Sequence, residues 1–143
     1  MMGGLPMPTD FKLVPPKSEE HMIQSSVIKW ARVVSVRYRE LDLLYAIPNG
    51  GARDVITGAR LKAEGVKPGI PDLCLPVARG GSHALYVEIK TPIGVISKKQ
   101  EDVIAKLTRF GNKVAVCRSA QEAIDTIMEY VKGQITTQKE KSE

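Results

Sequence analysis

The sequence has few cysteines and lacks a long apolar run, and each shortage excludes a class of protein. Cys74 and Cys117 both lie in apolar strand-like runs, so we expect buried, reduced thiols. Nothing near them resembles a zinc-ligand spacing. No apolar run is long enough to span a bilayer. Pro6, Pro8 and Asp10 do not fit the basic-then-apolar order of a signal peptide. We therefore expect a cytoplasmic protein with no membrane partner.

Composition and charge are those of a basic globular protein. A length of 143 residues suits one domain. The hydrophobic share of 43% is enough for a core, and the charged share of 26% argues against global disorder. A net charge of +5 favours a polyanionic partner, although many basic proteins bind no nucleic acid.

The two ends of the chain lack the apolar period of a folded segment. Residues 1–17 are rich in glycine and proline, which predicts a flexible arm. Residues 133–143 have no core-forming pattern, which predicts a disordered tail. The folded domain is therefore expected over residues 18–132.

Residues 69–90 have the pattern of a β-hairpin. Two apolar strand-like runs flank a turn cluster at residues 78–82. Asp72 stands where the first strand begins, and Glu88 and Lys90 stand where the second ends. In an antiparallel hairpin these ends lie side by side, and residues two apart share a face. Since buried charges are tolerated when they are paired or bind a metal, the three groups indicate a site.

Apolar period and capping residues predict the elements around this hairpin. Residues 19–36 should form a helix with Ser18 as its N-cap, and residues 53–64 another. Ser97 and Gln100 have capping-box spacing, and they open a helix whose apolar side ends at Phe110. The remaining expected elements are strands at residues 43–47 and 113–117 and a last helix capped by Ser119. The order α, β, α, β, β, α, β, α predicts an α/β fold with a small mixed sheet flanked by helices.

The charged residues of the hairpin suit phosphodiester chemistry. Asp72 and Glu88 would repel each other unless a cation lay between them. Carboxylate oxygens suit Mg²⁺ or Mn²⁺. Lys90 could supply positive charge or help to deprotonate a water molecule. Two acids, a divalent ion and a lysine are the groups that hydrolysis of a phosphodiester requires.

A family resemblance rests on the same residues. Pro71-Asp72 followed by Glu88-Ile89-Lys90 resembles the PD-(D/E)xK signature of the restriction-endonuclease-like superfamily, a short string that is specific only in context. The context is Gly69-Ile70-Pro71-Asp72-Leu73, Val87-Glu88-Ile89-Lys90-Thr91-Pro92, Gly94, Ser97-Lys98-Lys99-Gln100 and Glu20-His21-Met22-Ile23-Gln24. Together these segments resemble the VRR-Nuc family over residues 18–123, above all its small stand-alone forms in phages and bacteria.

The resemblance implies a restriction-endonuclease-like core and a role for each motif residue. Asp72 and Glu88 would bind the metal together with the backbone carbonyl of Ile89, and Lys90 would be the catalytic lysine. Nothing in the core motif departs from the family pattern.

Two further residues acquire roles through the resemblance, and each has a simpler interpretation beside it. Glu20 would act directly or through a metal-bound water, with Glu19 as the adjacent alternative; a helix-start acid is the simpler interpretation. Gln100 would be the family's active-site glutamine, and it could equally be the capping-box partner. Without these matches, Glu88 and Lys90 would be a surface ion pair of small energetic value.

Basic residues flank the proposed site on both sides. Either they form a solvated face, or they contact DNA phosphates. They are Arg53, Arg60, Lys62, Lys67, Lys98 and Lys99.

The leading hypothesis is a metal-dependent endonuclease that acts on branched or structured DNA. A homodimer that resolves four-way junctions is expected, because two symmetric cuts need two sites. The resemblance implies the same, since the small stand-alone relatives look like dimeric junction-cutting enzymes, which would place the protein in a bacterial or phage-infected cell. The alternatives are a flap, exonuclease or restriction-type nuclease, and a basic binding module without chemistry.

Overall fold

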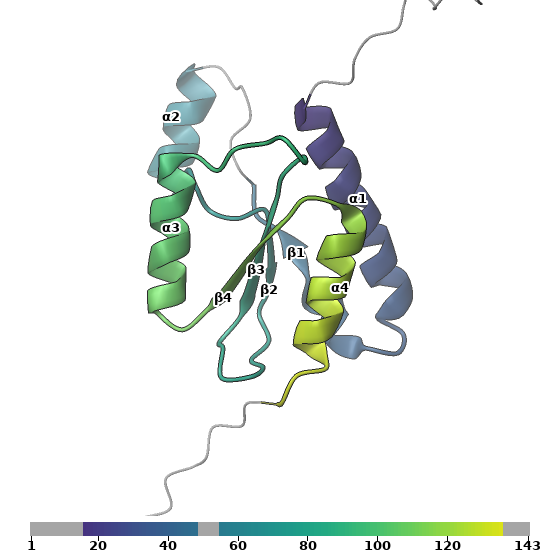
Figure 1. Cartoon of the computed structure of the whole chain (residues 1–143). Coiled ribbons are helices and arrows are strands. Elements are labelled where there is room, and N and C mark those ends of the chain that lie inside the picture. The colour runs from purple at the N-terminus through teal and green to yellow at the C-terminus, as the bar shows by residue number, and fades with distance from the viewer. Residues whose placement is uncertain (1–15, 49–54, 136–143) are drawn as a thin grey trace, which may run out of the picture.

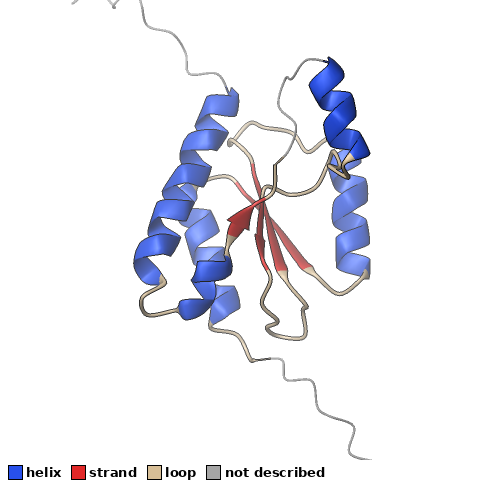
Figure 2. Ribbon diagram, turned by 180° about the vertical axis from the view of Figure 1, so that it is seen from behind, coloured by secondary structure: helices blue, strands red, loops and turns tan. Residues whose placement is uncertain are grey.

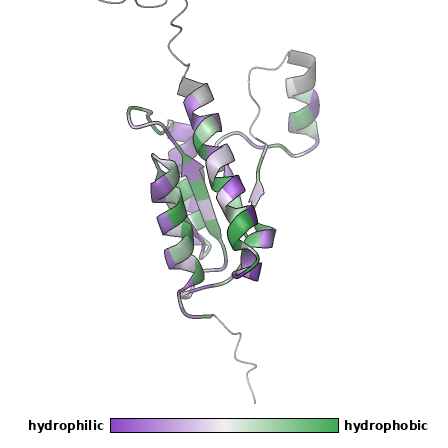
Figure 3. Ribbon diagram, turned by 90° about the vertical axis from the view of Figure 1, so that its right-hand side faces the viewer, coloured by the Kyte–Doolittle hydropathy of each residue, from purple (hydrophilic) through white to green (hydrophobic). Residues whose placement is uncertain are grey.

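Within residues 16–48 and 55–135, which this computed structural model describes, one four-stranded sheet has helices on both faces. Helices α1 (Pro16–Val34) and α4 (Ala120–Val131) pack on one face, and α3 (Lys98–Arg109) lies on the other (Figure 1). Helix α2 (Val55–Ala63) lies on the same side of the sheet as α3 and stands apart from the rest in Figure 3. No helix in these residues is long and apolar enough to cross a membrane.

The sheet is mixed and follows the chain order. The strands are β1 (Tyr45–Ala46), β2 (Leu73–Leu75), β3 (Leu85–Ile89) and β4 (Lys113–Cys117), and they lie in the order β1-β2-β3-β4. The pairs β1–β2 and β2–β3 are antiparallel, whereas β4 is parallel to β3 and is reached through α3 (Figure 2). The expected small mixed sheet with flanking helices is therefore confirmed.

The predicted hairpin of β2 and β3 is present and closes in a tight turn. Arg79 and Ser82 each donate a backbone N–H to the other's carbonyl, at 3.1 and 2.9 Å. Gly80 and Gly81 lie between them with φ of 56° and 85°. Two consecutive positive φ angles are the mark of a type I′ turn, whose twist matches that of the strands it joins.

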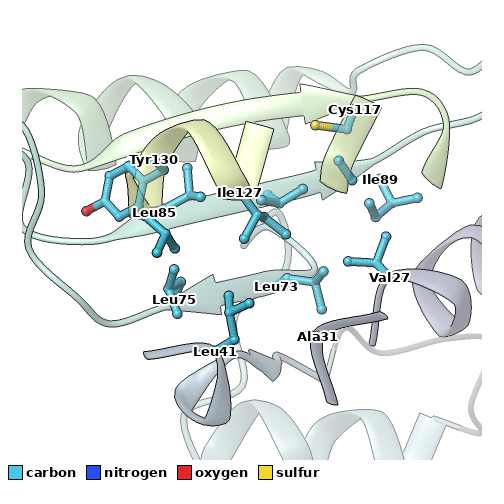
Figure 4. Close-up of a cluster of buried hydrophobic side chains, with 13 residues drawn as sticks. Val27, Ala31, Leu41, Leu73, Leu75, Leu85, Ile89, Cys117, Ile127 and Tyr130 are labelled. Carbon is cyan, nitrogen blue, oxygen red and sulfur yellow. The ribbon is translucent and has the colours of Figure 1, made fainter. Parts of the chain in front are cut away.

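Alternation along the strands gives the sheet a dry face and a second face that carries Glu88. Successive residues of a strand point to opposite sides. The dry face packs against α1 and α4, and Figure 4 shows its side chains converging. The core between this face and the helices contains strand residues and helix residues. The strands contribute Leu73, Leu75, Leu85, Val87 and Ile89, and the helices contribute Val27, Ala31, Leu41, Ile127 and Tyr130. The alternate residues of β2 and β3, namely Cys74, Tyr86 and Glu88, therefore point toward the side of α3.

The first helix begins earlier than predicted. It starts at Pro16, so Ser18 lies inside the helix and is not its N-cap, and the arm expected over residues 1–17 extends too far. Proline suits the first helical position, because its φ is already helical and it has no N–H to leave unpaired. The helix ends at Val34 rather than at residue 36.

The strand expected at residues 43–47 is shorter than predicted. A 3₁₀ helix, η1 (Arg39–Leu43), takes up its start, and β1 retains only Tyr45 and Ala46. Leu41 is buried in the core from η1, so tertiary packing overrides the local strand pattern. The helix expected over residues 53–64 is α2, of which residues 53 and 54 lie outside the described residues.

Two further expectations fail at the ends of elements. Phe110 is the C-cap of α3 and is 73% exposed, so it does not extend the apolar side of that helix. The tail is held beyond residue 133, because Gly80 N–H donates to the carbonyl of Gln134 at 2.7 Å and Ile135 bridges Arg79. Residues 136–143, the rest of the expected tail, lie outside the described residues.

Both thiols behave as the sequence predicts. Cys74 and Cys117 are free and buried. The bounds of β4 and the cap of α4, Ser119, are also as predicted.

Candidate active site

The register of the hairpin places Asp72 opposite Glu88. Leu73 pairs with Val87, so the next residues outward, Asp72 and Glu88, face each other across the two strands. Asp72 Oδ2 accepts a hydrogen bond from the backbone N–H of Ile89 at 2.7 Å. Its carbonyl accepts from Ile47 N–H at 2.8 Å. Asp72 is therefore held from both of the neighbouring strands.

The segment that leads to Asp72 passes close to the start of α3. Gly69 has a φ of 86°, and a Cβ added there would lie 2.9 Å from the backbone oxygen of Lys99. A contact that short requires glycine. This close approach brings the acid of the hairpin beside the first turn of α3.

Glu88 is a buried acid with one free oxygen. The residue is only 2% exposed. Its Oε1 accepts a hydrogen bond from Gln100 Nε2 at 3.0 Å and lies 3.8 Å from Lys90 Nζ. Its Oε2 is buried, and no residue in the described part of the chain donates a hydrogen bond to it. A buried oxygen without a donor is costly, and a cation would satisfy it.

Burial and neighbouring charge shift the titration of Glu88. Loss of solvent is the largest cause, and the facing carboxylate of Asp72 adds to it; together they raise the pKa of Glu88 to about 8. The positive charge of Lys90 lowers the pKa of Glu88, and the negative charge of Glu20 raises it by less than Asp72 does. Without a cation, Glu88 therefore keeps its proton at neutral pH.

Gln100 links the helix start to the acid. Its Oε1 accepts from Ser97 N–H at 2.9 Å, and its own N–H donates to Ser97 Oγ at 3.2 Å, which confirms the capping box. The amide nitrogen of the same side chain donates to Glu88. The capping-box interpretation of Gln100 is therefore confirmed, and its role as an active-site residue stays a prediction that the contact with Glu88 supports.

Lys90 lies at the mouth of the site. Its side chain is 13% exposed, and its backbone N–H donates to the carbonyl of Cys117 at 2.9 Å, so β4 fixes where it emerges. Its ammonium group can reach both Glu88 and a group bound beside that acid.

Glu20 lies in the first turns of α1 and is half-buried, whereas Glu19 is exposed. The charge of Glu20 raises the pKa of Glu88, so Glu20 lies on the same side of the molecule as Glu88. Across the described residues, no three acidic, histidine or cysteine side chains gather closely enough to hold a metal ion by themselves. Of the expected metal-binding residues, the structure brings together Asp72, Glu88 and Ile89, with Glu20 farther out.

The oxygens in this arrangement suit a hard divalent cation. Two facing carboxylates from Asp72 and Glu88, together with the carbonyl of Ile89, form an all-oxygen donor set of the kind that Mg²⁺ and Mn²⁺ prefer. Oε2 of Glu88, which has no hydrogen-bond donor in the described part of the chain, is the atom that a bound cation would contact. The residues present therefore fit the expected metal.

The expected DNA-contacting residues are exposed where the structure describes them. Lys62 and Lys67 are solvated, as is Lys99. Arg60 pairs with Glu64 at 3.2 Å and Lys98 with Asp102 at 3.0 Å. Arg53 lies outside the described residues.

Sequence reasoning missed Arg118, which follows β4. Its Nη1 donates to the carbonyls of Thr91 and Gly94, at 2.8 and 2.6 Å, and so fixes the loop after Lys90. No local pattern signals this contact, because the partners are far apart in sequence. The sequence predicted the strand at residues 113–117 that Arg118 follows, but not that this strand lies beside β3.

Comparison with known proteins gives one consistent result. A family model described as "VRR-NUC domain" matches residues 14–121. A solved structure described as "VRR_NUC domain protein" is similar with a TM-score of 0.71 and 26% identity, covering 87% of this chain and 94% of its own. No curated protein matches the chain.

We predict that Glu88→Gln stabilises the metal-free protein at high pH. The pKa of Glu88 is about 8 in the native state, above its ordinary value of 4.5, so deprotonation costs stability as the pH rises between those values. Below about pH 4.5 the group is protonated in both states and contributes nothing to the pH dependence. In urea unfolding with EDTA, the free energy of unfolding of the variant should rise relative to that of the parent as the pH increases from 4 to 8. The difference should grow by up to about 1.4 kcal/mol per pKa unit.

The matched control is Glu129→Gln, which neutralises an exposed acid on α4. Its unfolding free energy should follow that of the parent at every pH. Equal pH dependence in the parent and in Glu88→Gln would mean that Glu88 is not held protonated by its burial.

Proposed function

Because the chain belongs to the VRR-NUC domain family and so carries a nuclease-type domain, we propose that it is a Mg²⁺- or Mn²⁺-dependent DNA endonuclease. The observation that carries the proposal is the buried Glu88, which has a free oxygen, faces Asp72 and lies beside Lys90. Maintaining such a group costs stability, and pure nucleic-acid binding does not need it.

Each residue of the site has a chemical task in this proposal. Asp72, Glu88 and the carbonyl of Ile89 would hold the cation, which would supply activation of water and offset charge on the phosphate. Glu20 would contribute directly or through a metal-bound water molecule. Lys90 orients the attacking water or accepts its proton, and its charge stabilises the phosphate in the transition state.

Gln100 is a positioning residue in the proposed mechanism. By donating to Oε1 of Glu88, it fixes the carboxylate and would leave Oε2 available to a cation. Hydrogen-bond partners of metal ligands commonly act in this way.

The DNA backbone would be held by the exposed cations on both sides of the acids. Contacts of this kind bind duplex DNA without sequence preference and depend strongly on salt. The proposed contacts are Arg53, Arg60, Lys62, Lys67, Lys98 and Lys99.

We expect Asp72→Asn and Lys90→Ala to reduce plasmid cleavage in Mn²⁺ by about 100-fold or more. Asp72→Asn should also weaken Mn²⁺ binding, measured by calorimetry, whereas Lys90→Ala should leave DNA affinity close to that of the parent because many cations share the phosphate contacts. Lys106→Ala on α3 is the control for loss of one exposed charge.

Two results would contradict this assignment. Parent-level cleavage by Asp72→Asn would show that the acids are not the reacting site. Tight DNA binding by the parent, without cleavage in any metal, would favour a binding module without chemistry.

We expect Gln100→Glu to separate the two tasks of that residue. Glutamate can complete the capping box, so the melting temperature should stay close to that of the parent. It cannot donate to Glu88 and adds a like charge beside it, so cleavage should fall by about 10- to 100-fold. Gln100→Ala should lower both quantities, and a Gln100→Glu protein with full activity would restrict Gln100 to helix capping.

The proposed substrate is a four-way DNA junction, and the proposed working unit is a homodimer. One site of this kind cuts one strand, and resolving a junction requires two cuts related by symmetry. One domain also offers little surface to a branched duplex, and a second copy doubles its basic face. Trp30 and Val34 on α1 and Met128 on α4 are partly buried side chains that such an interface could cover.

Light scattering and cleavage assays together test the dimer. At micromolar concentration we expect the mass of two chains, and with Mn²⁺ paired cuts in junctions in preference to linear duplexes. Nicked, flapped and linear DNAs serve as controls. A monomer that cuts flaps and leaves junctions intact would overturn the dimer and its substrate, while keeping the nuclease assignment.

A further inference from the structure

The loop between β3 and α3 exposes two large apolar side chains beside the candidate site. Ile93 is 85% exposed and Val95 is 82% exposed. Among the large apolar side chains in the described residues, these two are the most exposed. A pair of such residues at one loop tip marks a contact surface better than single apolar residues scattered over a protein do.

The loop is held in one shape. Arg118 donates to the carbonyls of Thr91 and Gly94. Gly94 N–H donates in turn to the carbonyl of Thr91 at 3.1 Å, and Thr91 is buried with 1% exposure. The apolar tip is therefore presented by a preformed turn, so little conformational entropy is lost when it binds.

The loop is also continuous with the site. It begins directly after Lys90 and ends at the capping box of α3, whose Gln100 contacts Glu88. A Cβ added at Gly94 would lie 3.4 Å from Lys90 Cδ, so the turn packs against the lysine stem. In Figure 1 the loop runs over the end of the sheet where β3 ends, and in Figure 3 it projects from the body on the side opposite α2.

The charges around the tip identify its partner. Lys90, Lys98 and Lys99 flank the loop, and Arg118 supports it. Apolar side chains framed by cations match DNA, in which an anionic backbone surrounds stacked apolar bases. An apolar protein surface would cover Ile93 and Val95 but would offer no anion to the exposed Lys98 and Lys99 beside them, of which Lys98 also pairs with Asp102.

We propose that Ile93 and Val95 form an apolar wedge that inserts between stacked bases beside the cleaved phosphodiester. Aliphatic side chains inserted in this way unstack a base step and kink the duplex. The proposal rests on the proposed nuclease function and deepens it. The wedge favours DNA in which stacking is already interrupted, such as a branch point, because less unstacking is then required.

The first test measures base unstacking without cleavage. A four-way junction with 2-aminopurine at the branch point is bound in EDTA by the parent, by Ile93→Ser/Val95→Ser and by Phe110→Ser. Phe110 is the matched control, because it is 73% exposed at the opposite end of α3. We expect the parent and the control to raise the fluorescence of 2-aminopurine. The wedge variant should bind with a Kd within about threefold, since its phosphate contacts are intact, and leave the fluorescence unchanged.

The second test measures cleavage in Mn²⁺ on two junctions, one fully paired and one with mismatches beside the cut. The cleavage rate of the Ile93→Ser/Val95→Ser variant should fall about tenfold on the paired junction. It should fall less than about twofold on the mismatched one, because mismatched bases are already unstacked. Both positions are exposed, so equal melting temperatures will establish that the variant is folded.

Three outcomes would overturn the wedge: a parent that leaves the fluorescence unchanged, a variant that retains the fluorescence rise, or equal losses on both junctions. Conversion of a dimeric parent to a monomeric variant in light scattering would also overturn it, by assigning the tip to contact between copies. A parent that cuts no DNA would contradict the nuclease proposal alone, because the fluorescence arm needs neither metal nor cleavage.

Discussion

Burial of the Glu88 carboxylate is the constraint around which the hairpin and α3 are arranged. The acid lies on the face of β3 that points toward α3, and the first turn of α3 covers it while leaving one oxygen without a donor in the described part of the chain. Gly69 lets the chain before β2 pass close to that turn, and Asp72 is then held opposite Glu88 by bonds from two strands. Such an arrangement is less stable than an apolar one would be, which is expected where a fold maintains a reactive group.

The parts of the fold set by local rules could be predicted from the sequence. The capping box of Ser97, the cap of α4 and the β2–β3 hairpin each depend on residues close together in the chain. The facing of Asp72 and Glu88 followed as well, because antiparallel register fixes it once the hairpin is recognised. The role of Gln100 was visible only as two alternatives, since sequence spacing cannot show that one amide serves both partners.

The rest depended on contacts between distant segments. Leu41 enters the core from a 3₁₀ helix, which no local pattern announced, and Ile135 is held by a hairpin turn far from it in the chain. Phe110 stands at an apolar position in the period of α3, yet its side chain is 73% exposed in the folded chain. Arg118 supports the loop after Lys90 across a long sequence separation, and that is the kind of contact that only the folded chain reveals.

The same Arg118 contacts have a consequence for how the protein opens. They close one end of the crossover through α3, and backbone bonds from His83 to Gly111 and from Lys113 to Ala84 close the other. Although α3 has no fully buried side chain, the segments on both sides of it are therefore fixed to the paired strands β3 and β4. Detaching the whole helix from the sheet requires these loop contacts to open, so the stability of this exposed helix depends on bonds that lie outside it.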